Sequence, residues 1–146
     1  MSGMEPLAAL GLACNVMQLI SFSGEVISVV KAVKSGRSID PSAEAIAAQL
    51  ATASDAVSQS LRAVPKALDA DETEILDIAK ECLAAAVNLT TRLEKIRGGD
   101  TSSGSYRAGV ASAVKKMWNK REIEELESML CAHRKNLEMR LLQRNW

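Results

Sequence analysis

The chain has 146 residues and a mass of 15.6 kDa, a size that suits one domain with its own core. We therefore predict a single domain over residues 1–146. Hydrophobic residues make up 47% of the chain and aromatic residues 3%, and 18 basic side chains balance 18 acidic ones. This composition excludes a disordered chain and argues against a dedicated nucleic-acid binder, which carries a basic excess. It favours an all-α domain packed from aliphatic side chains.

The first predicted helix covers residues 6–34 and is apolar on nearly every side. Pro6 suits a first helical turn because its missing N–H has no partner there, and Ser35 with Gly36 ends the helix. The nineteen residues 6–24 carry no charge, which brings this stretch close to the length of a membrane-spanning helix. Such a helix is buried on most sides, either in a protein core or in lipid, and both interpretations stay open.

Two sets of residues on this helix are candidates for function. The apolar set is the surface that we expect to enter a membrane or to join copies of the domain: Leu7, Leu10, Leu12, Val16, Leu19, Ile20, Phe22, Val26 and Ile27. A thin polar stripe interrupts it at Asn15, Gln18 and Glu25. Within a membrane these polar groups need polar partners, which clustered copies of the helix or a water-filled lumen supply.

Two more long helices are predicted in the middle of the chain. The first covers residues 41–64, between Asp40, which suits an N-cap, and Pro65, which breaks a straight helix. The second covers residues 71–97, where apolar side chains repeat every three or four residues. The glycine pair that follows it is expected to end this helix.

The last third of the chain begins with a loop of small and polar residues at 98–106, which we expect to be flexible. A short helix over residues 107–117 and a long one over 119–143 follow, the second opened by a cap that Asn119 and Glu122 form. The breaks between segments favour helical hairpins, and the spacing of apolar residues suits shallow crossing angles. The sequence therefore predicts an antiparallel bundle of four long helices and one short helix.

Basic and acidic residues are unevenly divided along the chain. Residues 1–100 carry nine basic and thirteen acidic side chains, a net charge of −4, whereas residues 101–146 carry nine and five, a net charge of +4. A candidate patch for anionic lipid contains no acidic residue and consists of Arg107, Lys115, Lys116, Lys120 and Arg121. The other interpretation is a solvated face, because four glutamates follow directly and can pair with these side chains across one or two helical turns.

Residues that carry chemistry in enzymes and metal sites are sparse in this chain. There is one histidine, His133, and three cysteines, Cys14, Cys82 and Cys131, whose spacing fits no metal motif. Each cysteine stands among apolar residues and is interpreted as a small buried hydrophobe, and His133 as a half-buried residue of the last helix. No glycine-rich phosphate loop, HExxH or CxxC occurs, so we predict no enzymatic activity, no metal and no cofactor.

Two stretches give the chain a family resemblance. Residues 4–28, MEPLAALGLACNVMQLISFSGEVIS, and residues 113–142, AVKKMWNKREIEELESMLCAHRKNLEMRLL, resemble the N-terminal domain of fungal STAND proteins, the NOD-like receptors of filamentous fungi. This domain is also called HeLo-like. The family pattern begins at Met4, so residues 1–3 are interpreted as an addition before the native start.

The resemblance implies a cytoplasmic effector domain that oligomerises with itself and moves to membranes on activation, in innate immunity, heterokaryon incompatibility and programmed cell death. Its further implied partners are anionic lipids and the nucleotide-binding domain that follows in such receptors, and no nucleic acid is expected. From the residues themselves, a non-lytic adaptor that acts only through helix–helix contacts between proteins stays the alternative, because a helix over 6–34 also suits a bundle core.

Overall fold

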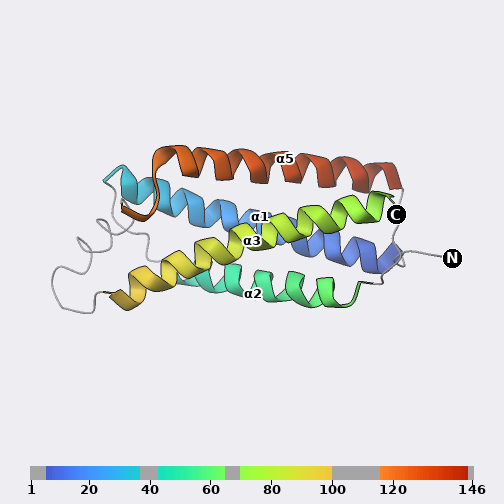
Figure 1. Ribbon diagram of the computed structural model, residues 1–146, viewed down its shortest axis with the longest axis horizontal. Helices are drawn as coiled ribbons and strands as arrows, with labels where there is room; N and C mark the ends of the chain where they lie inside the picture. The colour runs from blue at the N-terminus through green and yellow to red at the C-terminus, as the bar shows by residue number, and fades with distance from the viewer. Residues whose placement is uncertain (1–5, 37–42, 65–69, 100–115, 145–146) are drawn as a thin grey trace.

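The computed structural model describes residues 6–36, 43–64, 70–99 and 116–144 (Figure 1). Four α-helices account for almost all of them: α1 Pro6–Lys34, α2 Ala43–Arg62, α3 Ala70–Gly99 and α5 Lys120–Arg144. The prediction of an all-α bundle is confirmed for this part of the chain. The predicted short helix over 107–117 lies outside the described residues, apart from its last two positions.

Helices α1 and α3 run in one direction and α2 and α5 in the other, so α1 begins and α5 ends at the same end of the molecule (Figure 1). Helices α1 and α3 each pack against the other three described helices. Helices α2 and α5 do not contact each other, because α1 and α3 lie between them. This arrangement makes α1 a central helix of the bundle, not an appendage on its surface.

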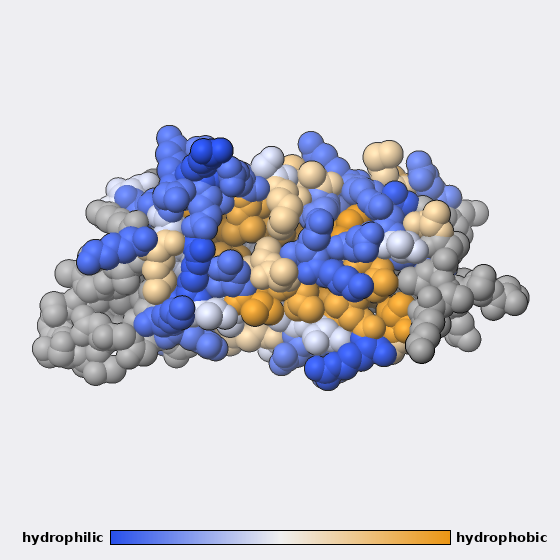
Figure 2. All heavy atoms as spheres, in the orientation of Figure 1, coloured by the Kyte–Doolittle hydropathy of each residue, from blue (hydrophilic) through white to orange (hydrophobic). Residues whose placement is uncertain are grey.

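The core is built from one side of each helix, as the spacing of apolar residues predicts. Helix α1 contributes the largest group of buried apolar residues: Leu12, Ala13, Val16, Leu19, Ile20, Val26, Ile27, Val30 and Val33. Figure 2 shows apolar residues along the middle of one face of the molecule, bordered by hydrophilic side chains. Burial of this kind of surface is the main favourable contribution to folding.

Two helix ends lie where the sequence predicts them. Helix α1 ends at Lys34, and Gly36 follows with a φ of 89°, a left-handed conformation that glycine adopts without strain. Its N–H donates to the Val33 carbonyl at 3.0 Å. At the start of α5, the Asn119 side-chain oxygen accepts a hydrogen bond of 2.7 Å from the Glu122 N–H, which confirms the predicted cap.

Other predicted boundaries differ from the structure. Helix α2 ends at Arg62, two residues before the predicted end, and its predicted start at 41 lies outside the described residues. Helix α3 continues through Gly99, so the glycine pair belongs to the helix and not to the predicted loop, the rest of which also lies outside. A helix 30 residues long tolerates glycine in its last turn, because each glycine costs only about 1 kcal/mol.

The interpretation of all three cysteines as buried residues is wrong for two of them. Cys82 is buried, and this burial raises the pKa of its thiol to about 12. Cys14 and Cys131 are exposed. Cys14 shares the solvent-facing side of α1 with Gln18, and Cys131 follows the buried Leu130 by one residue, a rotation of about 100° around the helix.

Candidate functional site

Six of the nine apolar residues predicted as the functional surface of α1 point into the bundle. Leu12, Val16, Leu19, Ile20, Val26 and Ile27 are all buried. Leu10 and Phe22 are partly buried, and the side chain of Leu7 lies outside the described part of the structure. In this state the predicted membrane surface is therefore the core surface of a bundle, which is one of the two interpretations that the sequence leaves open.

The predicted polar stripe lies on the opposite side of α1. Gln18 and Glu25 are exposed, and Asn15 is partly buried. The Asn15 amide nitrogen donates a hydrogen bond of 3.0 Å to the Ser60 hydroxyl of α2. A shallow pocket between the two helices is lined by Gln18, Phe22, Ala48, Gln49, Thr52, Ala53 and Ala56. The stripe thus borders the α1–α2 interface and leaves most of its polar groups in solvent.

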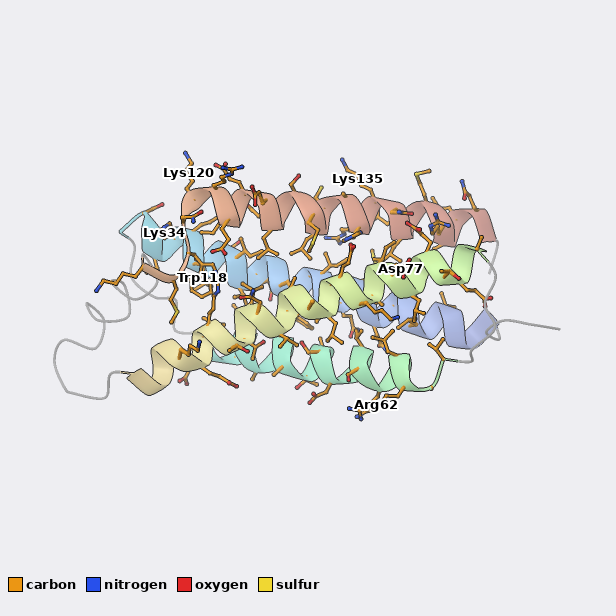
Figure 3. All side chains as sticks on the ribbon, in the orientation of Figure 1. Lys34, Arg62, Asp77, Trp118, Lys120 and Lys135 are labelled. Carbon is orange, nitrogen blue, oxygen red and sulfur yellow. The ribbon has the colours of Figure 1, made fainter. Side chains whose placement is uncertain are left out.

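The C-terminal end of α1 is held by polar contacts to α5 and to Trp118, which directly precedes α5 in the bundle. The Lys31 ammonium lies 3.2 Å and 3.3 Å from the two carboxylate oxygens of Glu127 on α5. The Lys34 ammonium donates a hydrogen bond of 2.5 Å to the carbonyl oxygen of Trp118. Figure 3 shows Lys34, Trp118 and Lys120 gathered at this end of the molecule.

Trp118 stands where α1, α3 and the start of α5 meet, and its side chain is only 2% exposed. Arg92 of α3 forms two hydrogen bonds to the Glu122 carboxylate, of 2.6 Å and 2.8 Å, and a third of 2.8 Å to the Met117 carbonyl. Its guanidinium carbon lies 5.5 Å from the centre of the Trp118 ring, within range of a cation–π interaction. We call Lys34, Arg92, Trp118 and Glu122 the Trp118 junction.

The Trp118 junction makes stability depend on pH through Glu122. The pKa of Glu122 lies below its usual value of 4.5, mainly because Arg92 donates hydrogen bonds to the carboxylate; burial opposes this effect and the positive charge of Arg92 adds to it. A lowered pKa in the folded state stabilises the fold above the unfolded-state pKa, and this stabilisation is lost as the pH falls through the folded-state value.

We expect Glu122→Gln to reduce the free energy of unfolding at pH 7 by about 1–2 kcal/mol, a modest effect because the Glu122 side chain is 40% exposed. The difference from the wild type is expected to shrink as the pH falls below about 4.5 and to vanish once Glu122 is protonated in the folded state. Urea unfolding followed by circular dichroism at several pH values measures it. A difference that stays constant down to the lowest pH contradicts this role of the carboxylate.

Two of the three described residues of the predicted lipid patch, Lys120 and Arg121, are paired with glutamates. Lys116, Lys120 and Arg121 are exposed, whereas Arg107 and Lys115 lie outside the described residues. Lys120 lies 3.9 Å from Glu124, and Arg121 lies 3.0 Å from Glu125, each pair four residues apart on α5. These contacts match the interpretation of a solvated face, and lipid binding by the patch stays a prediction.

His133 is half-buried, as predicted, and bridges two helices. Its Nε2 lies 2.6 Å from a carboxylate oxygen of Glu81 on α3, although the geometry is not that of an aligned hydrogen bond. Among the described residues, no group of three or more histidine, cysteine, aspartate or glutamate side chains could hold a metal ion.

Three residues that matter to the packing of α1 escaped prediction. Ser23 is fully buried, and its hydroxyl has no hydrogen-bond partner in the part of the chain that the structure describes. Lys34 and Arg92 belong to the Trp118 junction. Ser23 stands out in the sequence only as an interruption of an apolar run. The contacts of Lys34 span 84 residues of the chain and those of Arg92 span 25 and 30, so no local pattern could reveal them.

By length and apolarity, α1 is the one helix of the described residues that could cross a membrane. Within Leu10–Lys34, an 18-residue window has a mean hydropathy of 1.5, and 44% of that window is buried in the bundle. The core helix of a soluble protein meets the same criterion, so this property is compatible with both interpretations of α1.

Comparison with known proteins gives one match. A family model named SesA, described as an N-terminal domain on NACHT NTPases and P-loop NTPases, matches residues 16–137. No curated protein and no solved structure matches the chain. The matched range covers most of α1 and all of α2, α3 and the Trp118 junction, and it agrees with the resemblance to an N-terminal domain of NOD-like receptors. The chain therefore belongs to the SesA family, whose members are N-terminal domains on NACHT and P-loop NTPases, distinct from the NTPase itself.

Proposed function

We propose that this domain is a membrane-targeting effector of a NOD-like receptor and that α1 is the segment that enters the bilayer. The observation that carries the proposal is the length and apolarity of α1. Its 29 residues extend about 43 Å, which exceeds the hydrocarbon thickness of about 30 Å. The stretch 6–24 within it has no charged residue. Helix α1 thus combines the properties of a core helix with those of a membrane helix.

Release of α1 into water is strongly unfavourable. Exposing each of its large buried side chains, such as Leu12 and Leu19, costs roughly 1.5–3 kcal/mol. A lipid bilayer removes that cost, because the same side chains are then covered by hydrocarbon. The domain is therefore expected to stay a closed bundle in the cytoplasm and to open at a membrane when the attached NTPase domain gathers several copies.

Self-association follows from the polar stripe on α1. Gln18 is exposed in the bundle and Asn15 is partly buried, and a single copy of the helix in a bilayer would present these two side chains to lipid. Polar side chains within a membrane face one another or a water-filled space. An oligomer that places the stripe of each copy toward a common centre satisfies this requirement, and it connects membrane targeting with a pore and with regulated cell death.

The alternative function is an adaptor that binds other proteins and leaves membranes intact. It is favoured by the burial of α1 in the bundle and by the pocket between α1 and α2, which a partner helix could cover. In that case α1 stays docked while the protein acts. The two functions therefore differ in whether α1 has to move.

A reversible tether between α1 and α2 tests whether α1 moves. Asn15 and Ser60 are in hydrogen-bond contact, so Asn15→Cys with Ser60→Cys places two thiols within reach of a short bis-methanethiosulfonate linker. The exposed Cys14 and Cys131 are first replaced by serine. We expect dye release from vesicles rich in phosphatidylserine to fall to background in the linked protein and to return when a reductant cleaves the linker.

The same protein before and after reduction is its own control, because only the tether differs. If the linked and the reduced protein release dye equally, α1 does not have to leave α2 for release. This result would contradict the proposed function. An absence of release from either form, with both proteins folded by circular dichroism, favours the adaptor.

A further inference from the structure

Helix α1 has a weak point in its middle, at the sequence Ser21-Phe22-Ser23-Gly24. Serine and especially glycine are poorer helix formers than alanine. Close packing does not explain the glycine, because a Cβ atom built at Gly24 meets no atom within 4 Å. Gly24 therefore lowers the stability of the helix without making room for a neighbour.

Ser23 weakens the same point from the core side. Its side chain is 0% exposed, and its hydroxyl has no hydrogen-bond partner among the described residues. Other hydroxyls in this bundle donate to the carbonyl four residues back: Ser54 bonds to Leu50 at 2.9 Å and Thr90 to Ala86 at 2.8 Å. An unpaired buried hydroxyl favours any opening that lets water reach it.

The parts of α1 before and after this weak point differ in the number of polar contacts that they make to other helices. Before it, the described polar contact to another helix is the single hydrogen bond from Asn15 to Ser60. After it, Lys31 pairs with both carboxylate oxygens of Glu127, and Lys34 binds the Trp118 carbonyl. The charged side chains of α1 are likewise all in its second part, since none comes before Glu25.

We propose that α1 is a two-part helix with a hinge at Ser23–Gly24. Residues 6–22 form the moving segment, and residues 25–34 form the anchored segment, which stays docked on α5 and the Trp118 junction. The moving segment and the hinge together extend about 28 Å, close to the hydrocarbon thickness of a bilayer. Glu25, Lys31 and Lys34 then remain outside the lipid. What the moving segment does when free rests on the proposed function, whereas the hinge itself is a property of the soluble bundle.

Amide hydrogen exchange of the soluble protein tests the hinge without any membrane. In the wild type, amides of residues 10–22 are expected to exchange through an opening that leaves residues 26–34 protected. Replacing Ser23 and Gly24 by alanine is expected to slow exchange in the moving segment by roughly tenfold or more, because it removes the unpaired hydroxyl and the glycine.

The matched control is Gly11→Ala with Ser28→Ala, which makes the same two kinds of change in α1 at exposed positions away from the hinge. It is expected to leave the difference between the two segments in place. Equal exchange in both segments of the wild type, or an equal slowing by the control pair, would overturn the hinge.

A second tether separates the hinge from the proposed function. Lys31→Cys with Glu127→Cys allows the same reversible linker to hold the anchored segment on α5, in the background that lacks Cys14 and Cys131. We expect this linked protein to release dye from phosphatidylserine vesicles as its reduced form does, while the Asn15–Ser60 tether blocks release. If both tethers block release, α1 leaves as a whole and the hinge proposal is wrong, although the membrane function stands. If neither blocks it, the membrane function fails, and hydrogen exchange alone decides on the hinge.

Discussion

Leu19→Glu is expected to unfold the domain at neutral pH. Leu19 is 0% exposed in the centre of α1, a helix that contacts every other described helix. A glutamate there places a carboxylate among apolar side chains, or forces α1 away from the bundle to reach water. Either outcome costs about 4–5 kcal/mol or more. Domains of this size have a total stability of about 5–15 kcal/mol, so the substitution removes about a third of it or more, and all of it at the lower end of this range.

Gln18→Glu is the matched control, because it adds the same charge one residue earlier at an exposed position of α1. Its free energy of unfolding is expected to stay within about 0.5 kcal/mol of the wild type. Far-UV circular dichroism during urea titration measures both variants. A Leu19→Glu protein with the unfolding midpoint of the control would show that α1 is not a core helix.

The ends of helices were predictable where their cause is local. Gly36 ends α1 because its left-handed φ requires glycine, and Asn119 opens α5 because its side chain reaches the N–H of Glu122. Both effects act within four residues, so the local sequence predicts them. The end of α3 was predicted two residues early, because glycine weakens a helix without forbidding it, and a long packed helix outweighs its preference.

The buried faces were predictable from spacing, but single small residues at their edges were not. The described side chains of the apolar set of α1 are buried or partly buried, as its periodicity requires, and His133 is half-buried as predicted. Cysteine is small and weakly polar, so it fits a buried or an exposed helix position. Cys14 is therefore exposed beside the polar stripe, although its apolar neighbours in the sequence predict burial.

The contacts that hold α1 in place could not be predicted at all. Lys34 reaches the Trp118 carbonyl across 84 residues of the chain, and Arg92 reaches Glu122 across 30. These distances in sequence are bridged only once the helices are arranged in space. The unpaired hydroxyl of Ser23 could not be predicted for the same reason, because it depends on which groups of other helices surround the middle of α1.

The packing of α1 reconciles two properties that the sequence presents as alternatives. A helix that is apolar on nearly every side can lie in a bundle or in a bilayer, and the bundle is the state described here. Its polar contacts lie mostly after Gly24, whereas its uncharged stretch lies before it. A divided helix can therefore keep its attachment to the domain while its first part changes surroundings.

Trp118→Ala is expected to destabilise the bundle by about 3–5 kcal/mol, the usual cost of removing a large ring from a core. The Trp118 ring is 2% exposed and also lies under the Arg92 guanidinium, a contact worth roughly 0.5–2 kcal/mol. The backbone carbonyl that binds Lys34 remains in the variant, so the loss of stability measures the contribution of the ring. Because the ring supports the anchored segment, amides of residues 26–34 are expected to exchange faster as well.

Met139→Ala serves as the control for Trp118→Ala, because it truncates a side chain that is 59% exposed on α5 and reaches no junction residue through a described polar contact. Its effect on the free energy of unfolding is expected to stay below about 0.5 kcal/mol. Urea unfolding by circular dichroism compares the two variants, and hydrogen exchange locates the loss. If Trp118→Ala costs no more than the control, Arg92 and Lys34 hold the end of α1 without the ring. The junction then depends on its hydrogen bonds to Glu122 and to the Met117 and Trp118 carbonyls, and Arg92→Met becomes the variant that loosens the anchored segment.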